Sequence, residues 1–126
     1  KAYGNRDKVN GSLSVPLDQY EKNLEQLVIQ LKKTRAKLIW ASTTFVPKGE
    51  AGRRVGDEIK YNAIAEKIMN KHGVTINDLH QLTASLPATS FTKPGDVHFT
   101  RAGYDKLAAQ VAGSIKSALK AKEKTP

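Results

Sequence analysis

Residues 37–44 read Lys37-Leu38-Ile39-Trp40-Ala41-Ser42-Thr43-Thr44, with a continuous apolar run at the centre. A short apolar run is typical of a strand covered on both faces in a parallel sheet, whereas a strand with one face in water alternates apolar and polar residues. We therefore predict that this segment is the strongest strand of the chain.

Helical patterns lie on both sides of this segment. Apolar residues recur every three or four positions over 17–31 and two lysines follow, which predicts an amphipathic helix with cations in its last turn. A polar loop over 45–55 leads to a second helix at 57–71, which His72-Gly73 should end. The loop is longer than most connections and follows a strand, so it is a candidate for function.

The second half of the chain continues the alternation. Val74-Thr75-Ile76-Asn77 predicts a second short strand and 78–83 a brief helix, and a loop with two prolines covers 85–95. Thr100 can cap a final helix that has an apolar stripe. The order helix, strand, helix, strand, helix predicts an α/β protein in which crossover helices join parallel strands.

The two predicted strands are too few for a stable sheet, which normally has three or more. The chain also starts at Lys1 without an initiating methionine. We therefore expect residues 1–126 to be a single, partial domain whose missing strands precede Lys1 or come from another copy. Residues 120–126 are expected to form a frayed basic tail.

Composition narrows the function classes. The chain has 21 Lys and Arg against 12 Asp and Glu, a net charge of +9, but the basic residues are spread over helix ends, one loop and the tail. Because no aromatic residues are interleaved with them, nucleic acid is not favoured as a partner. There is no cysteine, which excludes a disulfide framework, a thiolate metal site and a cysteine nucleophile.

The sequence leaves the compartment open. Its longest apolar stretch is far shorter than the ~20 residues that span a bilayer, and residues 1–8 carry no apolar signal-peptide core. We expect a soluble domain without a membrane span, for which a secreted or periplasmic location is one alternative.

Asp96-Val97-His98 is the one place where the residues indicate chemistry. A carboxylate two positions from an imidazole, on a turn that Pro94-Gly95 introduces before a helix, can sit where a hydroxyl nucleophile needs a proton acceptor. His98 could also be a loop histidine that binds a backbone carbonyl, and Asp96 could cap the helix or bind a loop amide. Both interpretations stay open at this point.

Other polar residues carry weaker signals. His80 on the brief helix is expected to be partly buried and structural, and His72 suits a helix C-terminus. Ser42 ends the strongest strand but lacks the Gly-x-Ser-x-Gly turn that would expose a nucleophile. Arg53-Arg54 can be a solvated part of its loop or can face an anionic substrate. No cluster of ligands with supportive spacing indicates a metal, and no cofactor is expected.

A family resemblance rests on four motifs. The segment Pro94-Gly95-Asp96-Val97-His98-Phe99-Thr100, with Gly103-Tyr104, 37–44 and Tyr61-Asn62, resembles the C-terminal part of SGNH (GDSL-type) serine hydrolases over nearly the whole chain. The resemblance implies a flavodoxin-like three-layer sheet and His98 as general base. It also implies a serine nucleophile in a Gly-Asp-Ser turn after the first strand, with a glycine and an asparagine completing the oxyanion hole.

The chain departs from this family in two ways. The acid usually stands three residues before the histidine, a position that Gly95 occupies here, whereas Asp96 stands two residues before His98. The serine, glycine and asparagine blocks of the family all belong upstream of Lys1. Because an imidazole without its serine has no nucleophile to activate, this chain alone is expected to be inactive.

Two functions remain as hypotheses. The first is the C-terminal portion of a serine ester hydrolase that removes a short acyl or acetyl group from a carbohydrate or small molecule, with His98 as base and Asp96 as its partner. The second is a catalytically incomplete remnant or binding module that forms a homo-oligomer through its exposed sheet edge.

Overall fold

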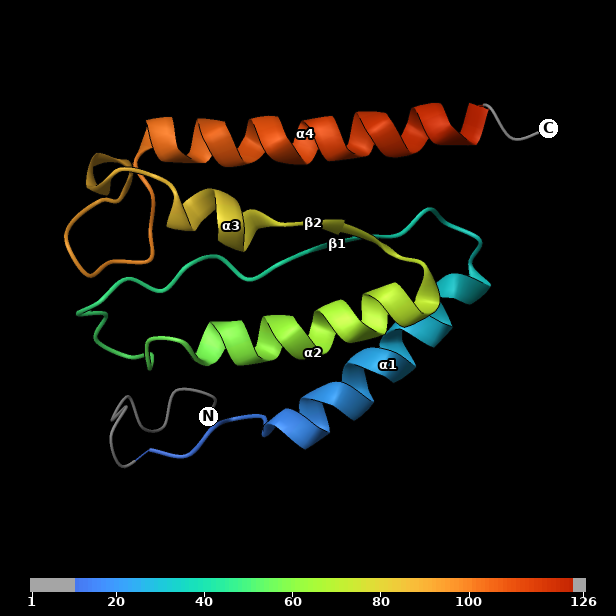
Figure 1. Cartoon of the computed structure of the whole chain (residues 1–126), viewed down its shortest axis with the longest axis horizontal. Helices are drawn as coiled ribbons and strands as arrows, with labels where there is room; N and C mark the ends of the chain where they lie inside the picture. The colour runs from blue at the N-terminus through green and yellow to red at the C-terminus, as the bar shows by residue number, and fades with distance from the viewer. Residues whose placement is uncertain (1–10, 124–126) are drawn as a thin grey trace.

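A computed structural model describes residues 11–123 of the chain (Figure 1). Its elements, in chain order, are α1 (Leu17–Lys33), β1 (Ile39–Ala41), α2 (Asp57–His72), β2 (Thr75–Asn77), α3 (Leu79–Ala84), a short 3₁₀ helix (Ala88–Ser90) and α4 (Arg101–Glu123). The predicted order of elements is confirmed. The end of the predicted tail, 124–126, lies outside the described residues, and α4 continues through its first part.

Within the described residues, β1 and β2 form a two-stranded parallel sheet. The register pairs Ile39 with Thr75, Trp40 with Ile76 and Ala41 with Asn77. Helix α4 lies on one side of the sheet and α2 on the other, and α1 packs against α2 (Figure 1). Helices on both sides of a parallel sheet confirm the predicted α/β class.

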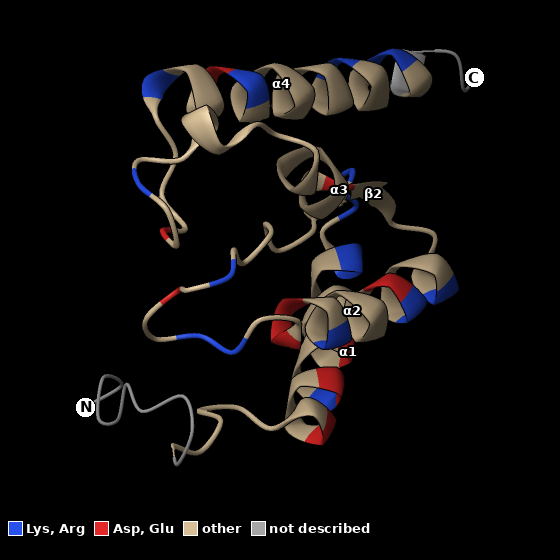
Figure 2. Cartoon of the chain, turned by 60° about the vertical axis from the view of Figure 1, so that its left-hand side comes forward, with Lys and Arg blue, Asp and Glu red and all other residues tan. Residues whose placement is uncertain are grey.

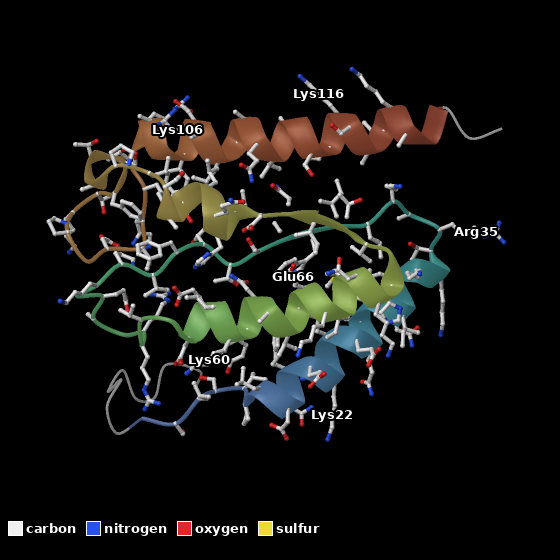
Figure 3. All side chains as sticks on the ribbon, in the orientation of Figure 1. Lys22, Arg35, Lys60, Glu66, Lys106 and Lys116 are labelled. Carbon is white, nitrogen blue, oxygen red and sulfur yellow. The ribbon has the colours of Figure 1, made fainter. Side chains whose placement is uncertain are left out.

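The main apolar core lies between α1, α2 and the sheet. Four buried residues form it: Val28, Ile68, Met69 and Val74. Leu38 and Trp40 stand two positions apart, so both point to the face of β1 that packs on this core, and both stay half-buried. Helices α1 and α4 carry charged side chains that point to solvent, among them Lys22 on α1 and Lys116 on α4 (Figure 3).

Strand β1 is shorter than predicted because a side chain takes over its hydrogen bonds beyond Ala41. The N–H of Ser42 still donates to the carbonyl of Asn77 at 3.0 Å. The N–H of Thr43 instead donates to Asn62 Oδ1, and the carbonyl of Thr43 accepts from Asn62 Nδ2, both at 2.9 Å. The Asn62 amide on α2 thus ends the strand where the polar loop begins.

Helix α4 begins at the predicted cap. The carbonyl of Thr100 accepts the N–H of Tyr104 at 2.9 Å, and its hydroxyl accepts the N–H of Gly103 at 3.4 Å. The N–H of Thr100 donates to the carbonyl of Ser90 at 2.8 Å. Thr100 therefore caps α4 and ties it to the end of the 3₁₀ helix.

Gly103 allows α4 to lie close to this tie. A Cβ atom at position 103 would lie 2.5 Å from the Ser90 carbonyl oxygen and 2.9 Å from the Phe99 Cβ. At Gly113, two helical turns or more further along α4, a Cβ atom would meet nothing within 4 Å. The two glycines of one helix thus differ only in their surroundings.

We predict opposite effects for alanine at these two positions. Gly103→Ala forces the helix away from Ser90 and should destabilise the fold by about 1–3 kcal/mol. Gly113→Ala removes only backbone freedom from the unfolded chain and should stabilise it by about 0.5–1 kcal/mol. Urea unfolding followed by circular dichroism measures both. Equal effects of the two substitutions would contradict the close approach at Gly103.

Candidate active site

Asp96 and His98 lie on a short loop before α4, and the pairing of Phe91 with Phe99 closes this loop. Phe91 and Phe99 form an isolated antiparallel bridge at its base, and the N–H of Thr92 donates to the carbonyl of His98 at 3.0 Å. At the tip, the N–H of Asp96 donates to the carbonyl of Lys93 at 3.2 Å. The third residue of this turn, Gly95, has φ of 74°, the conformation for which a Pro-Gly pair is suited.

This loop brings Asp96 and His98 into direct contact. Asp96 Oδ1 lies 2.6 Å from His98 Nδ1 and also accepts the N–H of His98 at 3.1 Å. Asp96 Oδ2 accepts the hydroxyl of Thr92 at 2.8 Å. The imidazole and the backbone N–H of His98 thus share one carboxylate oxygen.

The environment of Asp96 favours its ionised form. The bonds from His98 Nδ1, from the Thr92 hydroxyl and from the His98 N–H, in that order, hold the pKa of Asp96 well below its ordinary value. The side chain of His98 is 71% exposed, and its Nε2 has no hydrogen-bond partner among residues 11–123. A carboxylate thus fixes one ring nitrogen while the other stays open to solvent.

His98 lines a cleft of about 550 Å³. Its other walls include the segment 11–14, residues 43–44 after β1, the loop residues 52–54 and the first turns of α2. The hydroxyl of Tyr61 on α2 donates to the carbonyl of Val15, which holds the first segment against this helix. The imidazole therefore faces a space large enough for a small-molecule ligand.

Two buried carboxylates shape the loop that forms the opposite wall. Glu50 accepts the N–H of Gly52 at 2.8 Å and the N–H of Arg53, and its Oε1 lies 2.9 Å from Arg53 Nη1. Glu58 accepts the N–H of Val46 at 3.3 Å. It also accepts the N–H of the residue before α2, Gly56, at 2.9 Å. Sequence analysis missed both acids, because neither lies in a motif or in an apolar pattern.

A close approach of two glycines joins the two loops. A Cβ atom at Gly95 would lie 2.9 Å from the carbonyl oxygen of Gly49. Gly49 itself has φ of 92°. The loop that carries Asp96 therefore rests against the loop that carries Arg53, and Figure 2 shows both loops on the same side of the molecule.

The remaining polar candidates lie elsewhere. The hydroxyl of Ser42 donates to Asp78 Oδ1 at 2.9 Å and accepts the N–H of His80 at 2.8 Å, so both of its functions are engaged. Burial alone would raise the pKa of Asp78, but the Gln81 N–H and the Ser42 hydroxyl lower it below its ordinary value. Ser42 does not line the cleft that His98 faces.

The other two histidines, His80 and His72, each lie near a carboxylate other than Asp96. His80 Nε2 lies 3.5 Å from Glu58 Oε1, without a hydrogen bond, in a side chain that is mostly buried. His72 Nε2 lies 3.1 Å from Glu25 Oε1 at the end of α2, where Lys71 binds the same oxygen.

Among residues 11–123, no group of three or more His, Cys, Asp or Glu could hold a metal ion. None of the helices in this part of the chain has the length and apolar character of a membrane span.

Two solved structures described as hydrolases have a similar fold. The chain is similar to a lipase/acylhydrolase from Enterococcus faecalis, with a TM-score of 0.71 and 20% identity, over 90% of this chain and 57% of that one. It is also similar to LAE5, an alpha/beta hydrolase enzyme from the metagenome of Lake Arreo, Spain, with a TM-score of 0.60 and 19% identity, over 82% of this chain and 47% of that one.

These similarities show a hydrolase-like α/β fold, and the chain spans 57% and 47% of the lengths of the two structures. No protein-family model matches the chain, and no curated protein matches its sequence.

We predict that the contribution of Asp96 to stability depends on pH. Because its pKa is lowered in the folded state, the ionised carboxylate stabilises the fold above its ordinary pKa, and this contribution is lost as pH falls toward the lowered value. The difference in free energy of unfolding between the wild type and Asp96→Asn should therefore be larger at about pH 5 than at about pH 2.

Urea titrations at the two pH values measure this difference. The control is Asp105→Asn, which breaks an exposed ion pair with Arg101 on α4 and should change stability by at most about 1 kcal/mol at either pH. A difference for Asp96→Asn that does not shrink in acid would contradict an ionised Asp96 in the pair.

Proposed function

We propose that this chain supplies the histidine base and its acid partner to a serine ester hydrolase of the SGNH (GDSL) type. The observation that carries the proposal is the contact of 2.6 Å between Asp96 Oδ1 and His98 Nδ1, which leaves the Nε2 atom open at a cleft. The hydrolase-like fold supports the same reaction class. The substrate we propose is an ester of a short acyl group, such as acetyl, on a carbohydrate or small molecule.

The contact with Asp96 prepares the imidazole for proton transfer. When Nδ1–H donates to the carboxylate, the lone pair lies on Nε2, the atom that can accept a proton from a hydroxyl. The negative charge of Asp96 also stabilises the imidazolium that forms when the proton arrives. A pKa of Asp96 below its ordinary value keeps that charge in place.

The reaction proceeds by acyl transfer. A serine oxygen attacks the ester carbonyl as Nε2 takes its proton, and the imidazolium returns that proton to the departing alkoxide, which leaves as the alcohol. Water then attacks the acyl-serine by the same route and releases the carboxylic acid. His98 ends each cycle as it began, so the chemistry needs no cofactor.

The spacing of the acid follows from the turn. In the family that the sequence resembles, the acid stands three residues before the histidine, where this chain has Gly95. The turn at 93–96, closed by the bond from the Asp96 N–H to the Lys93 carbonyl, carries Asp96 to the imidazole from two residues away. This contact supports Asp96 as the partner of His98.

The nucleophile is proposed to come from a part of the protein beyond these 126 residues. Ser12 and Ser14 line the cleft, but no hydrogen bond joins either hydroxyl to His98 in the described part of the chain. The chain covers only 57% and 47% of the two hydrolase structures. The serine and the oxyanion donors of the proposed enzyme would therefore stand in the other part of the protein.

We predict that activity of the complete gene product depends on His98. His98→Ala should lower kcat for 4-nitrophenyl acetate by about four to six orders of magnitude with little change in KM, because loss of the base acts on the transition state. His72→Ala is the matched control, since it removes another histidine that contacts a carboxylate, and should leave kcat within about twofold of the wild type.

Steady-state kinetics of the two variants decide the proposal. A His98→Ala enzyme that retains a tenth or more of the activity would remove His98 from the role of base. Residues 1–126 alone should hydrolyse the ester no faster than their own His98→Ala variant. A Gly-Asp-Ser turn encoded upstream of the Lys1 codon would identify the serine to substitute next.

An oligomer-forming module is the second candidate, and exposed apolar side chains favour it. Ile59 on α2 is 55% exposed, and Ile115 and Leu119 on α4 are 47% and 59% exposed. The described sheet has two strands, so β1 has a free edge beside these helices. A second copy of the chain would cover apolar surface that a monomer leaves in water.

We predict that, on this second proposal, residues 1–126 form a dimer or larger species whose mass falls to that of a monomer in the double variant Ile115→Glu and Leu119→Glu. Light scattering after size exclusion measures the mass over a concentration series. Leu27→Glu is the control, because Leu27 is 53% exposed on the outer helix α1. A monomer at the highest soluble concentration would contradict self-association.

A further inference from the structure

Arg53 lines the same cleft as His98. We propose that this cleft binds an anionic oxygen group of the substrate, a carboxylate or a phosphate, and that Arg53 is its main ligand. That this group belongs to an ester rests on the proposed function. Figure 2 shows the cations of the loop before α2 on the same side of the molecule as the loop that carries His98.

The Glu50 carboxylate holds Arg53 in position. Glu50, whose side chain is 10% exposed, accepts the backbone N–H of Arg53 and lies 2.9 Å from its Nη1. The same carboxylate accepts the N–H of Gly52, so it orders the backbone on which the guanidinium stands. A buried acid that holds both backbone and side chain reduces the rotamer freedom that Arg53 would lose on binding a ligand.

Arg53 keeps donors for a ligand. Its side chain is 58% exposed, and Glu50 is its one hydrogen-bonded side-chain partner among residues 11–123. A guanidinium has five N–H donors in a planar fork, and this fork matches the two oxygens of a carboxylate or phosphate. One edge of the group can therefore stay on Glu50 while another binds an anion.

The acidic side chains of the cleft are already engaged. Glu58 is 3% exposed at its side chain and accepts the N–H groups of Val46 and Gly56. Asp57 lies 2.9 Å from Lys60 Nζ. Both carboxylates are thus neutralised or bound, which lowers their repulsion of an incoming anion. The net charge of +9 attracts anions to the molecule as a whole.

Arg54 links two walls of the cleft. Arg54 Nη2 donates to the carbonyl of Gly11 at 3.1 Å, which holds the segment 11–14 over the cleft. The ester of a bound substrate would then lie between the anion at Arg53 and the Nε2 atom of His98. Neutral esters of the same size would lack the ionic contact, so the cleft selects anionic esters.

Titration of residues 1–126 with inorganic phosphate and, separately, with sodium acetate tests this proposal. Amide and arginine side-chain NMR shifts give the dissociation constants. We expect saturable binding of one or both anions at the cleft, with saturation by phosphate or by acetate identifying the group. Arg53→Gln should weaken binding about tenfold or more, and Arg53→Lys, which keeps the charge but loses the fork, by several-fold.

The matched control is Lys48→Gln, which removes one positive charge from an exposed position of the same loop that does not line the cleft. It should change the dissociation constant by no more than about twofold. Absence of saturable binding, equal binding by wild type and Arg53→Gln, or equal losses in Arg53→Gln and Lys48→Gln would each overturn the proposal. Loss of binding in His98→Gln with retention in Arg53→Gln would place the anion on the imidazole and overturn it as well.

This titration is independent of hydrolysis. If His98→Ala leaves esterase activity intact, the base assignment fails while anion binding at Arg53 can still be measured. If the titration fails and His98→Ala abolishes activity, only the anionic substrate class is lost.

Discussion

Loop backbone N–H groups need acceptors, and in this protein four carboxylates supply several of them. Glu50 binds two N–H groups of its own loop, and Glu58 binds one on each side of that loop. Asp78 accepts the N–H of Gln81 at the start of α3, and Asp96 accepts the N–H of His98. A sheet of two short strands leaves long stretches of backbone without strand partners, so these acids order the edge on which the cleft lies.

The same constraint explains the geometry of the candidate site. A carboxylate that binds the amide of residue i+2 lies beside the side chain of that residue. In Asp96 this arrangement places Oδ1 within 3.1 Å of the His98 N–H and 2.6 Å from its Nδ1. The spacing that departs from the family resemblance therefore follows from a local turn with a glycine of positive φ. The Thr92 hydroxyl on Oδ2 completes the support of the carboxylate.

Local patterns predicted much of the fold. The apolar run at 37–44 predicted a strand, and β1 forms at its centre. The glycine after α2 and the cap at Thr100 rest on contacts within a few residues, and both predictions are confirmed. The length of β1 was not predictable, because the amide that ends it comes from Asn62, nineteen positions beyond Thr43. The sequence had no signal for a side chain that replaces a neighbouring strand.

The site was predictable only in part, because some of its side chains bind backbone groups and leave no sequence pattern. Asp96 and His98 are close in sequence, so a motif could identify them, and their contact needs only one turn. Glu50, Glu58 and Thr92 act through backbone amides or through a second carboxylate oxygen, and such bonds leave no periodic pattern. For Arg53 the sequence left solvent and an anionic ligand as alternatives, and only the structure shows that it lines the cleft.

The contacts that form the Asp96–His98 pair all lie between residues 91 and 103. The bridge of Phe91 with Phe99, the turn at 93–96 and the cap at Thr100 span at most eleven positions. The Thr100 N–H on Ser90 and the close approach of Gly95 to Gly49 join this segment to the rest of the fold. Loops closed over so few residues cost little chain entropy. The histidine half of the proposed site can therefore take its shape without any strand on the free edge of β1. On the proposed function, a serine nucleophile from another part of the protein would need a different kind of support, because long-range packing would have to hold it against Nε2.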